Sequence, residues 1–219
     1  MTATTTQPTT ADKSRYPLWV TLPYLAFVLV LIPMYLRQYG PQNFLWFSDI
    51  SLFATLVAVW TGNRMLASMM AVGVLPLEVV WAVDFFTGGH IGLAGYMYDA
   101  RIPLMLRTMS LFHLVFPVIV VWMLIRQGYD TRAIYLQTLV AWVILPASYL
   151  IGTKEENINW VYGPGGVPQG WFEPVTYLLI YMVFLPVVIY LPTHLALRKI
   201  FAEPRGYRES SRLKPSTQS

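Results

Sequence analysis

Six apolar stretches, each close to the length of a membrane-spanning helix, occupy most of this chain of 219 residues. A helix needs about 20 predominantly apolar residues to cross the hydrocarbon core of a bilayer. Charged residues make up 12% of the chain, whereas soluble domains carry roughly 25%. The sequence therefore predicts an all-α fold, a polytopic membrane helix bundle. Its six expected transmembrane helices cover residues 17–36, 43–61, 64–86, 103–125, 133–151 and 174–197.

The predicted transmembrane domain, residues 17–198, leaves only short segments on either side. Residues 1–16 are rich in threonine and are predicted to form a disordered N-terminal tail. Residues 199–219 are predicted to form a basic cytoplasmic tail. The first apolar run is too long for the core of a signal peptide, and no small-x-small cleavage site follows it, so we expect an uncleaved signal anchor.

Lysine and arginine are distributed unevenly between the two sides of the predicted bundle. If the N-terminus is cytoplasmic, the opposite side holds only Arg37, Arg101 and Lys154, and Arg107 lies within a span. The cytoplasmic segments then hold the other 11 of the 15 basic residues, which are Lys13, Arg15, Arg64, Arg126, Arg132, Arg198, Lys199, Arg205, Arg208, Arg212 and Lys214. Cytoplasmic segments are enriched in basic residues, so both termini are predicted to be cytoplasmic in a multi-pass protein of the cell membrane.

Composition excludes several kinds of site. The chain has no cysteine, which excludes disulfides, thiolate metal sites and cysteine nucleophiles. Its three histidines, His90, His113 and His194, fall in an outer loop, near mid-membrane and near the inner face. They cannot meet around one ion, and no metal and no cofactor are predicted.

The formal charge of +4 arises from basic residues at helix ends and in the C-terminal tail. That distribution indicates contact with lipid headgroups rather than with nucleic acid. We therefore expect membrane lipids as partners, and the sequence leaves open whether there is a protein partner.

Ionisable residues within the predicted spans are confined to one half of the membrane. They are Asp49, Glu78, Asp84, Arg107 and His113. At a rise of about 1.5 Å per residue, all of them fall in the outer half of the bilayer. Ionisable side chains inside a membrane are costly and commonly mark functional sites, so the sequence predicts a site that opens toward the outer side.

Helical spacing groups these polar residues into two stripes. Glu78, Trp81 and Asp84 recur every three residues on one predicted helix. Arg107, Ser110 and His113 do the same on the next helix, across a single outer loop. Because residues spaced by three lie on one side of a helix, we expect the two stripes to face each other.

The facing stripes predict specific pairs. Arg107 is expected to pair with Asp84 or Asp49 near the surface. His113 is expected to lie deeper, near Glu78 and Ser51. A second interpretation makes the Arg107–Asp84 pair purely structural and gives Asp49 a favourable place at a helix N-terminus, where the helix dipole stabilises an anion. Glu173 is expected to act in that way at the start of the last span.

The same residues supply the parts of a catalytic set. A histidine can take and return a proton near neutral pH, which suits His113 to general base catalysis. A hydroxyl nucleophile and a carboxylate that orients the base would complete it. The candidate catalytic residues are His113, Ser48, Ser51, Glu78 and Asp49, with Thr55 and Ser110 as further hydroxyls. The candidate substrate-binding residues are Arg107, Asp84, Trp81 and Trp160.

Two outer loops, residues 87–102 and 152–173, are longer than a connection requires and are rich in glycine and aromatic residues. Loops of that length are often functional. Aromatic side chains such as Trp160 and Trp171 are also typical of the membrane interface, so both interpretations stand.

The second half of the chain resembles a known family. From His113 it reads His-Leu-Val-Phe-Pro-Val-Ile-Val-Val-Trp, then Tyr129-Asp130-Thr131-Arg132, and Trp160-Val161-Tyr162-Gly163-Pro164 follows the next span. This pattern resembles the androgen-induced-gene family of multi-pass lipid hydrolases, over roughly residues 44–56 and 110–164. Members of that family hydrolyse fatty-acid esters with an intramembrane threonine and histidine. The resemblance implies His113 as the histidine, with Ser48 or Ser51 in place of the threonine.

Three functions remain open on these grounds. The first is a lipid-ester hydrolase or acyltransferase with an outward-opening intramembrane site. The second is a non-enzymatic carrier or binding protein for an ion or small ligand. The third is an accessory membrane subunit whose aromatic loops bind a partner.

Overall fold

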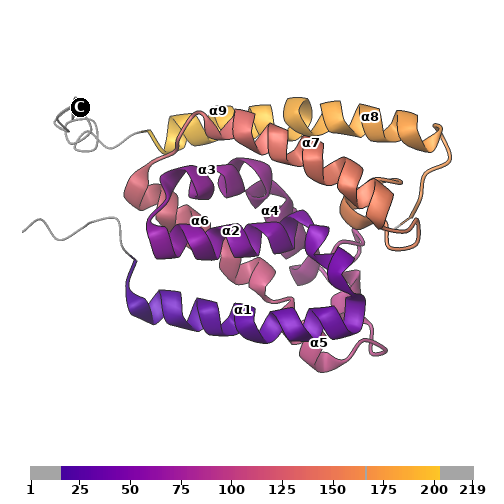
Figure 1. Cartoon of the computed structure of the whole chain (residues 1–219), viewed down its shortest axis with the longest axis horizontal. Helices are drawn as coiled ribbons and strands as arrows, with labels where there is room; N and C mark the ends of the chain where they lie inside the picture. The colour runs from indigo at the N-terminus through magenta and orange to yellow at the C-terminus, as the bar shows by residue number, and fades with distance from the viewer. Residues whose placement is uncertain (1–15, 166, 203–219) are drawn as a thin grey trace, which may run out of the picture.

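The computed structural model describes residues 16–202 except residue 166, and every regular element among them is a helix (Figure 1). The predicted all-α class is thereby confirmed. The predicted N-terminal tail, apart from Tyr16, and the predicted basic tail beyond Ala202 lie outside the described residues.

Four helical stretches among the described residues are long and apolar enough to cross a membrane. They are α1 (Leu18–Tyr39), the pair α5 (Leu104–Met109) and α6 (Phe112–Gln127), α7 (Ala133–Ile151), and the run of α8 (Pro174–Phe184), η4 (Leu185–Tyr190) and α9 (Leu191–Ile200). A fifth stretch joins α3 (Arg64–Gly73) to α4 (Leu75–Phe86) across a bend of 53°. These helices indicate a membrane protein with four or five spans.

The remaining predicted span is shorter than its hydropathy indicates. The sequence predicts a helix over residues 43–61, but α2 (Phe47–Thr61) has 15 residues because the 3₁₀ turn η1 (Pro41–Leu45) precedes it. Fifteen residues rise about 22 Å, less than the roughly 30 Å of a hydrocarbon core. The helix nevertheless packs between α1 and α3 in the middle of the bundle (Figure 1).

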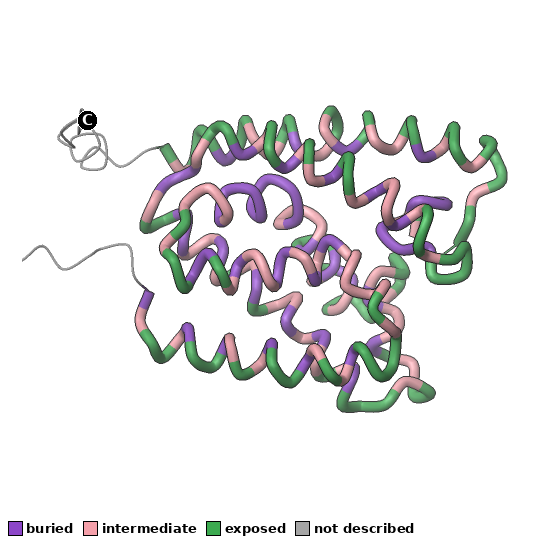
Figure 2. Tube along the Cα trace, viewed as in Figure 1, coloured by how far each residue is buried: buried purple, intermediate pink, exposed green. Residues whose placement is uncertain are grey.

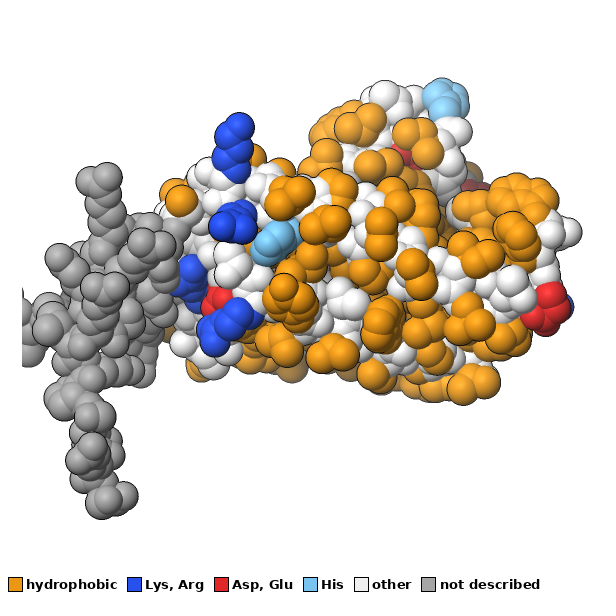
Figure 3. Space-filling view, turned by 90° about the horizontal axis from the view of Figure 1, so that it is seen from above, with side chains coloured by type: hydrophobic (Ala, Val, Ile, Leu, Met, Phe, Trp, Pro, Cys, Tyr) orange, Lys and Arg blue, Asp and Glu red, His pale blue; other side chains and the backbone are white. Residues whose placement is uncertain are grey.

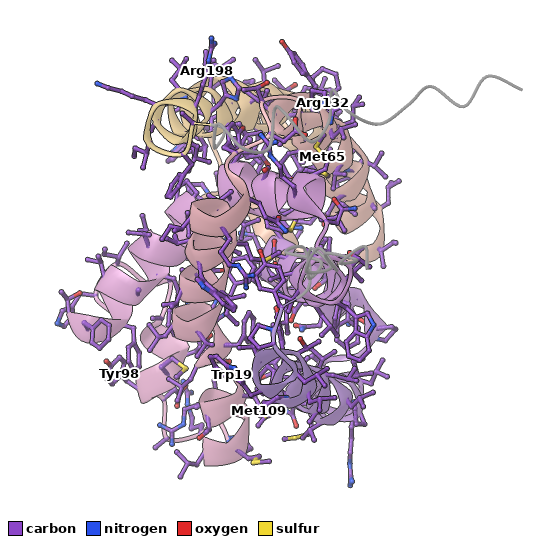
Figure 4. The ribbon with its side chains drawn as sticks, turned by 90° about the vertical axis from the view of Figure 1, so that its left-hand side faces the viewer. Trp19, Met65, Tyr98, Met109, Arg132 and Arg198 are labelled. Atoms are coloured by element: carbon purple, nitrogen blue, oxygen red, sulfur yellow. The ribbon has the colours of Figure 1, made fainter. Side chains whose placement is uncertain are left out.

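One end of the bundle gathers the start of α1, the α2–α3 turn, the α6–α7 turn and the end of α9, and we call it the basic end. Gln127 donates from Nε2 to the carbonyl of Gly62 at 3.0 Å, and the Tyr129 amide donates to the carbonyl of Phe201 at 2.9 Å. Figure 4 looks at the bundle from this end, with Arg132 and Arg198 on the side of α7 and α9. The first helix, α1, therefore begins at the same end of the bundle at which the last helix, α9, ends (Figure 1).

The opposite end, which we call the loop end, carries η1, η2 (Gly95–Tyr98) and η3 (Ile158–Trp160). Asn159 in η3 joins η1 and η3 to the bundle. Its Nδ2 donates to the carbonyl of Leu45 at 2.7 Å and to Oγ of Ser148 at 3.0 Å, and its Oδ1 accepts from the amide of Phe47 at 2.9 Å. Since α2 has no side-chain cap of its own, Asn159 supplies the partner that its first amide needs.

The break between α3 and α4 has a local cause. Pro76 has no N–H, and its ring would clash with the carbonyl of Val72 in a continuous helix. The helix stops at Gly73 and restarts at Leu75. Gly73 also lets α3 approach α7, because a Cβ there would lie 2.4 Å from Nε2 of the buried Gln137.

A second proline is compensated by a neighbouring helix. Pro186 leaves the carbonyl of Met182 without its helical donor, and the chain forms the π-helical segment η4 at this point. The indole of Trp142 on α7 donates to that carbonyl at 2.9 Å. The bond fixes α8 against α7 where the intrahelical ladder is interrupted.

Buried residues concentrate on α3 and on the inward sides of its neighbours (Figure 2). The outward faces are apolar. In Figure 3 the face formed by α7, α8 and α9 is covered largely by hydrophobic side chains, with Lys and Arg gathered toward the basic end. Leu179, Val183 and Val187 on this face are 55–59% exposed. A contiguous apolar surface of this kind is typical of contact with a membrane.

Removal of the Asn159 side chain tests how the loop end is attached. Asn159→Ala leaves three buried polar groups without their partner, and each costs about 1–3 kcal/mol. We expect a loss of at least about 3 kcal/mol in unfolding free energy, measured by denaturant unfolding in detergent micelles. The exposed cap Asn63→Ala, which removes one bond to the amide of Leu66, is the control and should cost about 1 kcal/mol. Equal losses in the two variants would contradict this account.

Candidate functional site

Glu78 of α4 and His113 of α6 meet inside the bundle. Oε2 of Glu78 and Nδ1 of His113 are 2.6 Å apart. The side chain of Glu78 is 3% exposed and that of His113 is 13% exposed. The approach of the two polar stripes, expected from helical spacing, is confirmed at this pair.

Both side chains belong to helix starts created by breaks in the spans. Glu78 lies in the first turn of α4, directly after the break at Val74. His113 is the second residue of α6, which follows an irregular turn at Ser110 and Leu111. Irregular backbone within a membrane is tolerated where it is buried in protein or lines a cavity, and here it places two ionisable groups against each other.

The imidazole of His113 is held by its hydrogen bond with Glu78 and by contacts with two aromatic rings. Its ring centroid lies 4.5 Å from that of Trp81 at an interplanar angle of 20°, and 4.1 Å from that of Phe112 at 24°. An ionised Glu78 accepts the Nδ1–H and so fixes the tautomer that leaves Nε2 as the basic nitrogen. The predicted site residue Trp81 therefore contributes by orienting the base.

An open groove of about 520 Å³ lies between α4 and α6 and exposes this pair. Val79, Val83 and Phe86 form its α4 wall, and Leu114 and Pro117 form its α6 wall. The α4 residues are 51–75% exposed, so the groove opens sideways on the apolar surface. Its size is in the range of small-molecule sites.

Asp49 lies behind the pair, on α2. It is 3% exposed, its Oδ2 accepts from Nδ2 of Asn43 at 3.2 Å, and its Oδ1 has no hydrogen-bond partner in the described part of the chain. It is close enough to Glu78 for the two carboxyl groups to interact electrostatically. The predicted candidate Asp49 thus bonds Asn43 and is within electrostatic range of Glu78, and no hydrogen bond joins it to the imidazole in the described part of the chain.

The candidate nucleophiles do not reach His113. Ser51 is buried and its Oγ has no hydrogen-bond partner, and Ser48 is partly buried. Within the described residues, no hydrogen bond joins either serine to the imidazole. The arrangement is a base with its orienting carboxylate and no attached side-chain nucleophile.

The expected ion pair between Arg107 and Asp84 or Asp49 is wrong for the described residues. Asp84 is fully buried and accepts three backbone amides of the outer loop, from Ile91, Leu93 and Ala94, at 2.6–2.7 Å. The guanidinium of Arg107 donates instead to the carbonyls of Ile102 and Met97. Asp84 and Arg107 therefore each supply hydrogen-bond partners to backbone amides or carbonyls that have no partner within a helix.

The predicted binding residue Trp160 lies at the loop end. It belongs to η3, is partly buried and has a positive φ of 61°. It is not among the described residues that line the α4–α6 groove. The structure therefore leaves Trp160 outside the α4–α6 groove.

Sequence reasoning missed two tyrosines near the pair. The hydroxyl of Tyr35 on α1 lies 3.2 Å from Oγ of Ser110, and Tyr96 in η2 interacts with the side chains of Ser110 and Trp81. A signal existed for Tyr35, since Tyr24 and Tyr35 fall in the buried stripe of α1, spaced by threes and fours along an otherwise apolar helix. A hydroxyl on the packed side of a spanning helix commonly contacts a polar group on its neighbour.

Acidic groups outside the spans are kept ionised at the loop end. The Arg101 guanidinium beside Asp99 lowers the pKa of that carboxyl to about 2. The amide of Gln42, which donates to Glu156 at 2.7 Å, lowers the pKa of Glu156. Both carboxyl groups are therefore ionised near neutral pH.

Comparison with protein-family models, with curated proteins and with solved structures found no match. In the described part of the chain, no group of three or more His, Cys, Asp or Glu side chains could hold a metal ion. The fold and the site together define an all-helical membrane protein with a buried His–Glu pair beside a laterally open groove.

Substitutions at Glu78 test the pair directly. Glu78→Ala leaves Nδ1 of a mostly buried His113 without its partner and should cost about 1–3 kcal/mol of unfolding free energy. Glu78→Gln retains an acceptor for the Nδ1–H and should cost less. Unfolding in detergent micelles measures both variants. Equal stability of Glu78→Ala and the unmodified protein would show that the contact does not hold α4 to α6.

Proposed function

We propose that the protein is an enzyme of the cell membrane that cleaves or transfers the acyl group of a lipid ester, as a hydrolase or acyltransferase. The observation that carries this proposal is the His113–Glu78 pair at the base of a groove that opens on the apolar surface. An acyl chain can lie against the groove walls while its ester group meets the imidazole.

The chemistry follows from the tautomer that Glu78 selects. Nε2 of His113 accepts a proton from the attacking oxygen, which forms a bond to the acyl carbonyl carbon. When the C–O bond of the ester breaks, the imidazolium returns the proton to the departing alcohol oxygen. Glu78 stabilises the imidazolium in between, as an orienting carboxylate does in general base catalysis.

The attacking oxygen is proposed to come from outside the protein. Because neither Ser48 nor Ser51 is hydrogen-bonded to His113 in the described part of the chain, water is the acceptor in hydrolysis and a hydroxyl compound is the acceptor in acyl transfer. Ser51 then has a structural role in α2. The resemblance to the androgen-induced-gene family supports a lipid-ester substrate and the role of His113, though not the serine that the resemblance implied.

The proposed topology has six spans with both termini in the cytoplasm. The excess of Lys and Arg at the basic end supports this orientation. The start of α1 and the end of α9 at the same end require an even number of crossings, which α2 completes despite its length. A short span can be accommodated by local thinning of the bilayer.

Single-cysteine labelling tests this topology, because the chain has no cysteine of its own. Gln42→Cys and Asn63→Cys flank α2 and should react from opposite sides of the membrane. Lys154→Cys should react with an impermeant thiol reagent in intact cells, and Lys199→Cys only after permeabilisation. Reaction of Gln42→Cys and Asn63→Cys from one side would exclude α2 as a span.

Lipid turnover by the purified protein in nanodiscs tests the activity. His113→Gln should lower the release of fatty acid by roughly 100-fold or more, because it removes the general base. His90→Gln, the same change at an exposed histidine of the outer loop, should leave turnover unchanged. Equal turnover in His113→Gln and the unmodified protein would reject the proposed role.

The same preparation distinguishes the alternatives. If a lipid co-purifies and stays intact with every ester tested, the groove is a binding site and the protein is a carrier. If a stoichiometric protein co-purifies and no lipid does, the accessory-subunit hypothesis is favoured.

A further inference from the structure

A second hollow of about 330 Å³ opens at the loop end of the bundle. It lies between the end of α1, the start of α2 and the segment before η3, and it is lined by Gln38, Tyr39, Asn43, Trp46, Glu156 and Ile158. We call it the loop-end pocket. Half of these side chains carry an amide or a carboxylate, and Glu156 is held ionised by Gln42. The pocket is therefore a place for water rather than for an acyl chain.

Asn43 connects this pocket to the interior. It lines the pocket and also donates from Nδ2 to Oδ2 of Asp49 at 3.2 Å. Asp49 is 3% exposed, and its second carboxyl oxygen has no hydrogen-bond partner within the described ranges. A buried carboxyl oxygen without a partner is costly, so this atom is suited to bind a small polar molecule that arrives past Asn43.

Asp49 in turn is within electrostatic range of the His113–Glu78 pair. It interacts electrostatically with Glu78 and with Tyr35, and Tyr35 contacts Ser110, three residues before His113. Polar groups therefore lead from the loop-end pocket through Asn43 to Asp49, which is within electrostatic range of Glu78. The α4–α6 groove approaches the same pair from the lipid side, and its walls are apolar.

Hydrolysis needs a water molecule at the imidazole, and apart from Glu78, Thr87 and His113 the lining of the groove is apolar. We propose that water reaches His113 from the loop-end pocket by way of Asn43 and Asp49, whereas the lipid arrives through the α4–α6 groove. This inference rests on the proposed hydrolase or acyltransferase function. Asp49 is a positioning residue for the attacking water, and it makes no bond to the acyl group.

Competition between water and a membrane-soluble alcohol tests the proposal. The protein in nanodiscs is given a lipid ester with octanol, and both products, free fatty acid and octyl ester, are measured. Asp49→Asn should lower the ratio of hydrolysis to alcoholysis by about tenfold, as expected for a group that positions one of two competing acceptors. Asp99→Asn, an outer-loop carboxylate away from this path, should leave the ratio unchanged. An unchanged ratio in Asp49→Asn overturns the proposal.

Thiol labelling tests the path without any turnover. Asn43→Cys and Asp49→Cys should react with a small water-soluble thiol reagent added from the outer side, whereas Val28→Cys, equally buried in the core at 3% exposure, should not. If Asn43→Cys reacts and Asp49→Cys does not, the path ends at the pocket and the proposal is overturned. If Asp49→Cys does not fold, labelling of Asn43→Cys must lower the hydrolysis-to-alcoholysis ratio, and an unchanged ratio overturns the proposal.

The two proposals fail separately. If the unmodified protein forms neither product, the proposed function fails, and the labelling pattern still decides whether water reaches Asp49. If both products form and labelling stops at Asn43, the proposed function stands and the water path fails.

Discussion

Backbone amides and carbonyls inside a bilayer have no water to bond, and every break in a helix must be satisfied by another part of the protein. This chain breaks or tightens its helices at several positions within the bundle, and the break near Gly73 and the irregular turn near Ser110 matter most. At other positions a side chain from a distant segment supplies the missing partner. Trp142 donates to the carbonyl that Pro186 leaves free, and Asn159 accepts the first amide of α2. The arrangement of the helices depends on these hydrogen bonds from distant segments.

The same breaks create the polar interior. In continuous helices Glu78 and His113 would each be a costly ionisable group in an apolar span. After the breaks, each lies in the first turn of a new helix, and the two meet at 2.6 Å. The aromatic rings of Trp81 and Phe112 then fix the imidazole plane. The helix breaks therefore set the geometry of the Glu78–His113 pair and also allow these two ionisable side chains to be buried.

In the proposed mechanism, the pair is approached from two chemically different directions. The α4–α6 groove has apolar walls and opens sideways, and the loop-end pocket has polar walls and opens at the end of the bundle. A protein that acts on an ester in a membrane has to bring together a substrate that dissolves in lipid and an acceptor that dissolves in water. Separate approaches to one base meet that requirement without exposing the interior to bulk water.

The sequence by itself determined the class of fold and the location of the polar groups. Apolar runs of spanning length and the positions of Asp49, Glu78 and His113 depend only on local composition and helical spacing, so the all-α class and the meeting of Glu78 with His113 could be predicted. The N-cap at Glu173, which accepts the amides of Val175 and Thr176, is likewise local.

The tertiary structure decided which partner each polar group takes. Asp84 and Arg107 have opposite charges at matching depth, yet each bonds loop backbone, because the folded outer loop presents unpaired amides and carbonyls that hydropathy does not reveal. The short α2, the turn at Ser110 and the separation of Ser51 from His113 also depend on packing between helices distant in sequence. Helix rotation and helix breaks are set by those contacts, whereas spacing along the chain sets only which residues share a face.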